Sequence, residues 1–222
     1  MDLDPHVETT TLDNGLGVTT VALPHLHTAV CSLFIKVGSR FESPADNGLS
    51  HFVEHMMFRG TERYATSLAL NTAVERLGST LHAETGRDYT MFQMSLEPEN
   101  VPAAIALLGE LLGQPRFSDI ELERQLILEE FNEDYDEHDA EINDGDLARG
   151  MAFEDHPLGQ RIIGPRANVE RFAVTDVRRH FTTFYGARNA ILCVAGPVQH
   201  GRVVEAAMQE FGAMPAGSRA DV

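Results

Sequence analysis

The first apolar runs of the chain predict β-strands. Residues 17–23 (GVTTVAL) and 29–37 (AVCSLFIKV) are rich in β-branched side chains, and such runs favour strands. The connection between them is short and contains Pro24. We therefore predict that these two strands form an antiparallel pair.

Two later regions carry the same strand signal. Residues 80–85 and 89–96 flank a turn at Gly86-Arg87-Asp88, and this pattern predicts a β-hairpin. Residues 191–195 form another short apolar run near the end of the chain. The sequence thus predicts a hairpin and a separate late strand in addition to the first pair.

Apolar residues that recur every three or four positions predict helices. The first helix is expected to begin near Asp46 or Asn47 and to end before Gly60. Strands and helices then occur in groups rather than in strict alternation, which indicates the α+β fold class with a mixed, largely antiparallel sheet flanked by helices. The other helices are expected at residues 68–77, 101–112, 119 to about 136, 176–185 and 201–211.

Length and composition indicate one globular unit. The chain has 222 residues, of which 43% are hydrophobic, and this is enough to bury a core. No Pro/Gly-rich linker divides it, so we predict a single domain over residues 1–222. No run of about 18 apolar residues is present, so no membrane span is expected. The acidic start, MDLDP, lacks the apolar region of a signal peptide, which favours the cytoplasm.

The net charge of −17 would repel nucleic-acid phosphates, so we exclude nucleic acid as a partner. Many of the acids lie between Glu129 and Asp146. Two interpretations stay open: a solvated surface, which we favour, or an acidic rim that attracts basic peptides. Cys31 and Cys193 lie in separate strand-like runs, so two buried thiols are expected rather than a disulfide.

The most informative motif is His51-Phe52-Val53-Glu54-His55. In a helix, the two histidines project from one face about one turn apart. Two imidazoles so placed are the usual start of a zinc site, and a nearby carboxylate is where a water-activating base belongs. The order His-x-x-Glu-His is the inverse of the commoner His-Glu-x-x-His. We interpret His51 and His55 as candidate zinc ligands and Glu54 as the candidate general base.

A catalytic zinc ion needs a third protein ligand besides its water. The helix expected after Asp119 carries several acids that could serve. Glu123 and Glu130 share a stripe with Ile127 at helical spacing, which tilts both acids toward the interior. The alternative that these are ordinary surface acids of the helix remains open on this ground. The acids of this helix are Glu121, Glu123, Glu129 and Glu130.

Seven segments in order carry a resemblance to a known family. They are residues 38–42 (GSRFE), 47–61 (NGLSHFVEHMMFRGT), 78–85 (GSTLHAET), 123–130 (ERQLILEE), 156–159 (HPLG), 163–165 (IGP) and 184–190 (FYGARNA). Together they resemble the pitrilysin and mitochondrial-processing-peptidase family of zinc peptidases. The resemblance extends from about residue 12 to residue 211 and implies that family's fold and activity.

The resemblance also implies roles for individual residues. It places the third ligand at Glu130, so that His51, His55 and Glu130 would hold one zinc ion per chain. It places Glu123 beside the site as a further catalytic candidate, where a carboxylate can orient a ligating imidazole or the bound water. The family's substrate-binding edge strand corresponds to residues His82, Ala83, Glu84 and Thr85.

The same resemblance implies a partner. Family enzymes resemble two related halves that close around a chamber, and the half without zinc supplies an Arg and a Tyr to the reaction. This chain is similar to the zinc-bearing half. We therefore expect a second homologous domain or subunit, with a homodimer as the alternative arrangement.

Three functions are compatible with these observations. The first is a zinc metalloendopeptidase, a hydrolase that cleaves extended peptides or unfolded proteins. The second is a binding or scaffold subunit of a two-subunit processing peptidase that cannot turn over alone. The third is S-ribosylhomocysteine lyase, which uses the same motif but needs a Cys ligand, whereas Cys193 lies in a strand-like run. We favour the first.

Six other histidines have no partner at ligand spacing. We expect most of them to lie at the surface or in turns. They are His25, His27, His138, His156, His180 and His200.

Overall fold

The computed structural model describes residues 5–138 and 140–221. Its strands form one six-stranded sheet in the order β1-β2-β6-β3-β5-β4. β2 and β6 are parallel, and the other neighbouring pairs are antiparallel. This confirms the predicted α+β class with a mixed, largely antiparallel sheet. The strands are β1 (His6–Thr11), β2 (Gly17–Ala22), β3 (Ala29–Ile35), β4 (His82–Thr85), β5 (Thr90–Leu96) and β6 (Ala190–Gly196).

One predicted strand pairing is wrong. β2 and β3 run in opposite directions as expected, but β6 lies between them and pairs with both. Two strand spacings separate β2 from β3, about 10 Å, and the connection after β2 crosses that width. On its way the N–H of Leu23 donates to the carbonyl of Gly196 at 2.8 Å. A strand from the far end of the chain therefore takes the central place.

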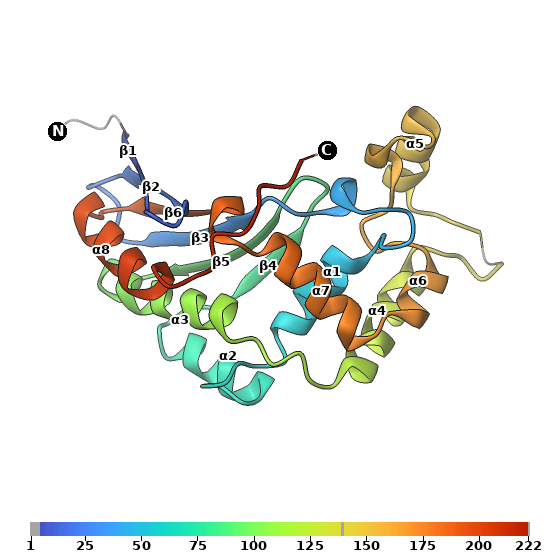
Figure 1. Ribbon diagram of the computed structural model, residues 1–222, viewed down its shortest axis with the longest axis horizontal. Coiled ribbons are helices and arrows are strands. Elements are labelled where there is room, and N and C mark those ends of the chain that lie inside the picture. Colours follow the sequence, from blue (N-terminus) through green and yellow to red (C-terminus); the bar gives the residue numbers. More distant parts are fainter. Residues whose placement is uncertain (1–4, 139, 222) are drawn as a thin grey trace.

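The helices lie along one face of the sheet, and α5 stands apart at one end of the molecule (Figure 1). α5 and α6 were not predicted from the sequence, because α5 has no buried residue and α6 has only six residues. Neither can show a clear apolar repeat. The helices are α1 (Leu49–Met57), α2 (Ser67–Glu75), α3 (Val101–Gly113), α4 (Ile120–Glu133), α5 (Asp144–Phe153), α6 (Arg166–Arg171), α7 (Val174–Phe184) and α8 (His200–Phe211).

β1 was also missed. Its sequence, HVETTT, is mostly polar and exposed, so it has no alternation of apolar residues to reveal it. Thr9 of β1 and Thr19 of β2 illustrate this, since their hydroxyls hydrogen-bond to each other on an exposed surface at 3.1 Å. β1 is therefore held by backbone pairing with β2 rather than by a core.

The core lies between the sheet and the helices. In β3, Ala29, Cys31, Leu33 and Ile35 are fully buried on alternate positions, because they face the helices that cover this side. On the opposite face of the sheet, Ile191 of β6 remains 50% exposed. Within the described residues, no helix is long and apolar enough to cross a membrane.

Candidate metal centre and catalytic site

Helix α1 carries both motif histidines and has an unusual N-terminus. Gly48 precedes it with φ 103°, in the left-handed region, and a Cβ there would lie 2.6 Å from the carbonyl oxygen of Ile163. The helix is capped instead by Glu42, whose carboxylate accepts from the N–H groups of Gly48 and Ser50 at 2.9 and 2.6 Å. Burial raises the pKa of Glu42, and these bonds oppose the rise. A buried acid thus anchors the turn that carries His51.

The imidazoles of His51 and His55 lie together on one face of α1, with ring centroids 4.6 Å apart. Helix α4 packs against α1 and brings Glu130 to both rings. Oε1 of Glu130 lies 3.4 Å from Nε2 of His51, and Oε2 of Glu130 lies 3.4 Å from Nε2 of His55. One potential ligand atom of each residue lies within 4.8 Å of the others. The three side chains therefore converge on one point.

This donor set suits a divalent metal ion. Two imidazole nitrogens and one carboxylate oxygen match the ligands of catalytic zinc sites, which keep a further position open. The Nδ1 atom of His51 is buried without a hydrogen-bond partner. Glu130 presents its carboxylate to both imidazoles, whereas the carboxylate of Glu123 is already paired with Arg59. A cation at this point would balance the charge of Glu130.

The pKa shifts reflect this arrangement. Hydrogen bonds from His51 and then His55 hold the pKa of Glu130 well below its usual value. Burial lowers the pKa of His55, but its hydrogen bonds to Glu123 and Glu130 outweigh burial and raise that pKa to about 9. In the absence of a metal ion, a proton on His55 thus compensates the carboxylates. A metal ion and this proton would compete for the same place.

Glu123 lies behind His55 rather than in the cavity. It is 2% exposed, and its Oε2 lies 3.1 Å from Nδ1 of His55. Its Oε1 pairs with the guanidinium of Arg59. A carboxylate on Nδ1 leaves Nε2 of the ring as the metal-facing atom. Glu123 is therefore placed to orient His55, and Arg59 to hold Glu123.

A cavity of about 510 Å³ opens in front of the cluster. His51, Glu54, His55 and Glu130 line one side of it. The carboxylate of Glu54 accepts a hydrogen bond from the hydroxyl of Thr85, 2.5 Å from Oε2. The general-base candidate thus reaches the same space as the potential metal ligands.

The edge of the sheet forms another side of this cavity. β4 is the outermost strand and pairs only with β5 among the described strands. Ala83, Glu84 and Thr85 line the cavity, whereas His82 does not line it and is exposed. Three of the four residues expected to contact substrate therefore border the cluster, and His82 lies outside the cavity.

The remaining wall carries an ion-pair network that the sequence did not reveal. Asp134 and Asp146 line the cavity, but both pair with Arg161, at 2.5 and 3.3 Å. Asp146 also pairs with Arg87 at 2.8 Å. The guanidinium of Arg161 lies 4.9 Å from the ring centroid of Phe131. These acids are neutralised within the chain, and no local spacing could have linked them to arginines so far along the sequence.

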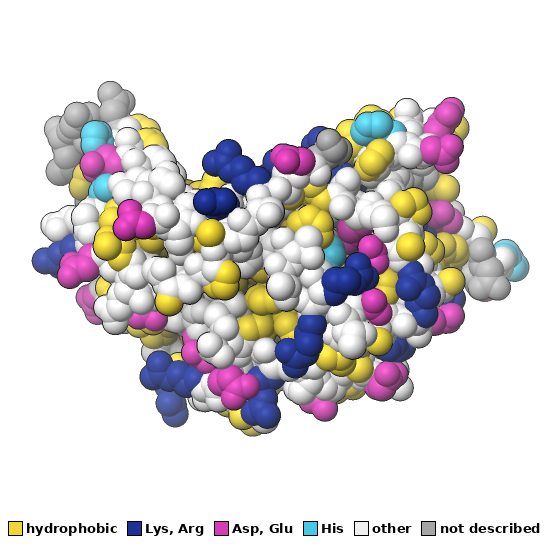
Figure 2. Space-filling model, in the orientation of Figure 1, with side chains coloured by type: hydrophobic (Ala, Val, Ile, Leu, Met, Phe, Trp, Pro, Cys, Tyr) yellow, Lys and Arg dark blue, Asp and Glu magenta, His cyan; other side chains and the backbone are white. Residues whose placement is uncertain are grey.

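The visible surface shows the same mixture of charges (Figure 2). Acidic and basic side chains are interspersed over this face instead of forming one acidic patch, and the outline is concave between the β1 end and the α5 end. The described residues that line the cavity itself include six acids and no Arg or Lys.

His180 corrects one expectation. Most of the other histidines are exposed or partly exposed as predicted, but His180 of α7 is 3% exposed. Its Nε2 lies 3.1 Å from the hydroxyl of Ser50, on the far side of α1 from the cavity. Burial lowers the pKa of His180 to about 4. It is a neutral packing residue behind α1.

The two cysteines are free. Cys31 is buried and Cys193 is partly buried on the next strand, where Cys31 pairs with Val194 in the register of β3 and β6. Successive residues of a strand point to opposite faces, so the two sulfur atoms lie on opposite sides of the sheet. Both cysteines belong to the sheet, so neither is part of the histidine cluster.

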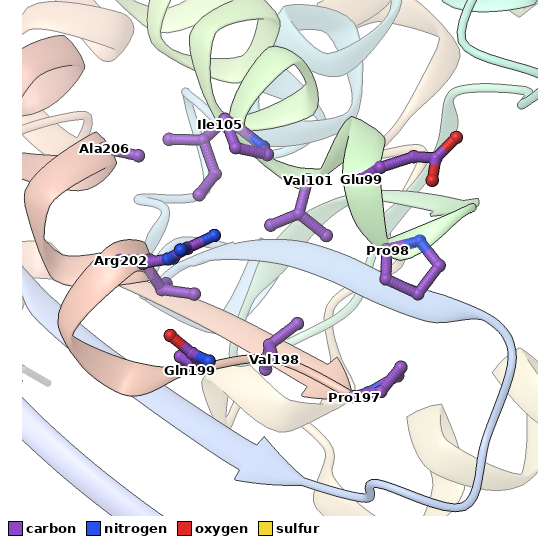
Figure 3. Close-up of a pocket in the computed structure, with 11 residues that line it drawn as sticks. Pro98, Glu99, Val101, Ile105, Pro197, Val198, Gln199, Arg202 and Ala206 are labelled. Carbon is purple, nitrogen blue, oxygen red and sulfur yellow. The ribbon is translucent and has the colours of Figure 1, made fainter.

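A second cavity of about 190 Å³ lies between the start of α3 and the start of α8 (Figure 3). Val101 and Val198 point toward each other across it, and Gln199 and Arg202 contribute polar groups. It contains no cluster of metal-binding side chains. The larger cavity with the histidines is thus the better candidate for chemistry.

Comparisons with known proteins agree with this geometry. Residues 18–166 match the family described as insulinase, peptidase family M16. The mitochondrial-processing peptidase subunit beta of Lentinula edodes is 35% identical over 216 residues, which are 96% of this chain and 46% of that protein. Cytochrome b-c1 complex subunit 1 of Homo sapiens is 33% identical over 215 residues, 95% of this chain and 44% of that protein.

Solved structures share the fold. A protease from Helicobacter pylori superposes with a TM-score of 0.89 at 24% identity, over 99% of this chain and 52% of that chain. A peptidase M16 inactive domain from Pseudomonas fluorescens superposes with a TM-score of 0.87 at 17% identity, over 98% of this chain and 53% of that chain. The chain spans about half the length of the curated relatives it matches.

Proposed function

The chain belongs to the insulinase family of peptidases, family M16, and from this we propose that it is the metal-bearing domain of a zinc endopeptidase that cleaves extended peptides. The observation that carries the proposal is the convergence of His51, His55 and Glu130 on one point beside Glu54. A peptidase of this kind needs three ligands, an open position and a base in one cavity. His51, His55 and Glu130 as ligands and Glu54 as the base would meet these needs.

In this proposal each group has one role. Zinc held by His51, His55 and Glu130 would lower the pKa of a water toward neutrality and polarise the scissile carbonyl. Glu54 would take a proton from the water as its oxygen bonds to the carbonyl carbon, and would pass that proton to the amine as the C–N bond breaks. Glu123 orients the ring of His55 through its Nδ1 atom, 3.1 Å away. Glu123 therefore acts through His55 and does not touch the substrate.

The edge strand supports an extended substrate. β4 has an unpaired edge among the described strands, and a peptide can add to such an edge through backbone hydrogen bonds. Ala83, Glu84 and Thr85 line the cavity, so a peptide paired there would run past Glu54. Backbone recognition tolerates many sequences. Asp134 and Asp146 are paired with Arg161, whereas Glu84 and Glu133 also line the cavity and are exposed.

The working enzyme would include a second homologous domain or subunit. Relatives matched over most of this chain are about twice its length. In addition, no Arg or Tyr of the described residues lines the cavity beside Glu54, so a donor for the oxyanion would come from elsewhere. A homodimer is the alternative source. The compartment remains a prediction, and the names of several relatives refer to mitochondria.

A binding or scaffold role is the second candidate. It is favoured by one observation, the 33% identity to a protein named as a subunit of the cytochrome b-c1 complex. The lyase alternative has less support, because both cysteines lie in strands of the sheet rather than in the cavity. The convergence of His51, His55 and Glu130 beside Glu54 favours the peptidase.

The metal proposal is tested by elemental analysis of purified variants. The wild type should hold one zinc ion per chain, and Glu130→Gln should lose most of it. The matched control is Glu129→Gln, which changes the neighbouring exposed acid on the same helix and should hold as much zinc as the wild type. Equal zinc in Glu130→Gln and the wild type would remove Glu130 from the ligand set.

The peptidase proposal is tested with Glu54→Gln. This variant should keep its zinc, because Glu54 is not a ligand, and should cleave an unstructured peptide about 100-fold more slowly or worse. The wild type is assayed beside it, and cleavage by the wild type distinguishes a peptidase from a scaffold subunit. Zinc binding without cleavage, even with a homologous partner domain added, would favour the scaffold role.

A further inference from the structure

The hydroxyl of Thr85 is committed to the carboxylate of Glu54. Thr85 is the last residue of β4 and is 8% exposed. Its Oγ1 lies 2.5 Å from Oε2 of Glu54. Among the described residues, it is the one protein group that hydrogen-bonds to this carboxylate. No Arg, Lys or His of those residues forms an ion pair with Glu54.

The supply of protons near Thr85 fixes the direction of this bond. A threonine hydroxyl has one proton to donate and two lone pairs. The neighbouring hydroxyl of Thr90 lies 3.5 Å from that of Thr85 and donates to the carbonyl of Val37 at 3.3 Å. An ionised carboxylate can only accept. The proton of Thr85 therefore points to Glu54, and Thr90 does not compete for that acceptor.

We propose that Thr85 is the positioning residue of the general base: its hydroxyl fixes Oε2 of Glu54 and leaves Oε1 to take the proton. This inference rests on the proposed peptidase function. It adds a role for the Thr85 side chain to the expectation that its strand binds substrate. Thr85 borders the cavity, but its single donor is already used.

The bond also joins the base to the edge of the sheet. Glu54 lies on α1 and Thr85 on β4, and these two elements pack against each other. A peptide that adds to β4 would order the strand that holds the base. Substrate docking and base alignment would then depend on the same residue.

A flexible glutamate gains from such a tether. A free Glu side chain samples several rotamers, and a base misplaced by about 1 Å can cost on the order of 100-fold in rate. Loss of the hydroxyl should therefore lower kcat about 10- to 100-fold. KM should stay within about twofold, because the backbone that would pair with substrate is unchanged.

The test uses three variants of the full chain, assayed with the homologous partner domain if the wild type needs it. Thr85→Val has nearly the same shape but no hydroxyl, and should show the fall in kcat with zinc content unchanged. Thr85→Ser restores the hydroxyl and should recover most of the rate. Thr90→Val is the comparison, since it removes the buried hydroxyl 3.5 Å from that of Thr85 but leaves the bond from Thr85 to Glu54, and its kcat should fall less than that of Thr85→Val.

A double variant shows whether Thr85 acts through the base. Glu54→Gln with Thr85→Val should be no slower than Glu54→Gln alone. Further slowing, a change in KM only, or wild-type kcat in Thr85→Val would overturn the inference. An active Glu54→Gln would instead overturn the proposed function, so the two failures are distinguishable.

A crystal structure of Thr85→Val gives a readout that needs no activity. Glu54 should leave its wild-type rotamer or occupy more than one, while His51, His55 and Glu130 stay in place. An unchanged, singly ordered Glu54 in that variant would show that Thr85 is not what positions it.

Discussion

His55 Nδ1 lies 3.1 Å from Oε2 of Glu123, on the side of the ring away from the cavity. Glu123 and Glu130 are seven residues apart on α4, so they project from one stripe two turns apart. Through this spacing one helix contacts the same imidazole twice. Glu130 faces its Nε2 and Glu123 its Nδ1. A single helix can thereby supply a ligand and orient a second one.

Glu123→Gln should weaken metal binding without abolishing it. The ring of His55 would lose its charged partner, and Arg59 would be left without its carboxylate. Loss of such an orienting group typically costs about 10- to 100-fold in metal affinity. Competition with a chelator of known affinity measures the change. Glu121→Gln, an exposed acid on the same helix, should bind zinc as the wild type does.

Glu42→Gln should destabilise the folded protein by about 1–3 kcal/mol. The carboxylate accepts bonds from two backbone N–H groups and from the Asn47 amide, and one amide oxygen cannot replace both carboxylate oxygens. Urea unfolding of the zinc-free protein measures the loss. Glu75→Gln on the exposed side of α2 is the control, and an equal change in both variants would contradict the capping role.

His180 should make stability fall as the pH falls from about 6.5 to about 4. Burial lowers its folded-state pKa to about 4, whereas the unfolded chain titrates near 6.5. Between these values the unfolded state binds a proton that the folded state does not. The free energy of unfolding therefore decreases by about 1.4 kcal/mol for each pH unit of acidification in this window.

His180→Gln removes this titration. Between pH 6.5 and 5, the zinc-free wild type should lose about 2 kcal/mol more stability than the variant. Other titrating groups contribute equally to both proteins and cancel in the comparison. Parallel curves for the two proteins across that interval would show that His180 titrates normally.

Cys31 should resist thiol reagents in the native protein. Burial, and then the nearby Cys193, raise the pKa of the Cys31 thiol to about 12, so almost no thiolate exists at pH 8. Labelling should be slow in native buffer and reach two thiols per chain in denaturant. Cys31→Ser identifies the residue, because it should remove the slow fraction. Rapid labelling of native Cys31 would mean that the strand opens.

The chain alone should be a weak peptidase. The described residues that line the cavity include no Arg or Tyr to stabilise an oxyanion, and a lost donor of this kind costs about 3 kcal/mol, a hundredfold or more in rate. Cleavage of a disordered peptide should rise strongly when a zinc-free homologous domain is added. Full activity from a proven monomer, linear in its concentration, would refute the need for a partner.

The sequence by itself determined much of the local structure. The spacing of His51 and His55 predicted a helix that brings them to one face, and α1 is that helix. The stripe of Glu123, Ile127 and Glu130 on α4 predicted acids that turn inward, and Glu123 is indeed buried, although Glu130 is partly exposed at the cavity. These relationships depend on residues within one or two turns, so helical periodicity is enough to reveal them.

Only the tertiary structure decided which distant groups meet. β6 separates β2 from β3, Arg161 neutralises Asp134 and Asp146, and the proton of Thr85 points to Glu54. Hydrophobic periodicity tells each segment which face to bury, but it does not tell a strand its neighbour or a hydroxyl its acceptor. Those choices follow from packing the whole chain, because non-local pairing and hydrogen-bond satisfaction are settled only when every buried group must find a partner.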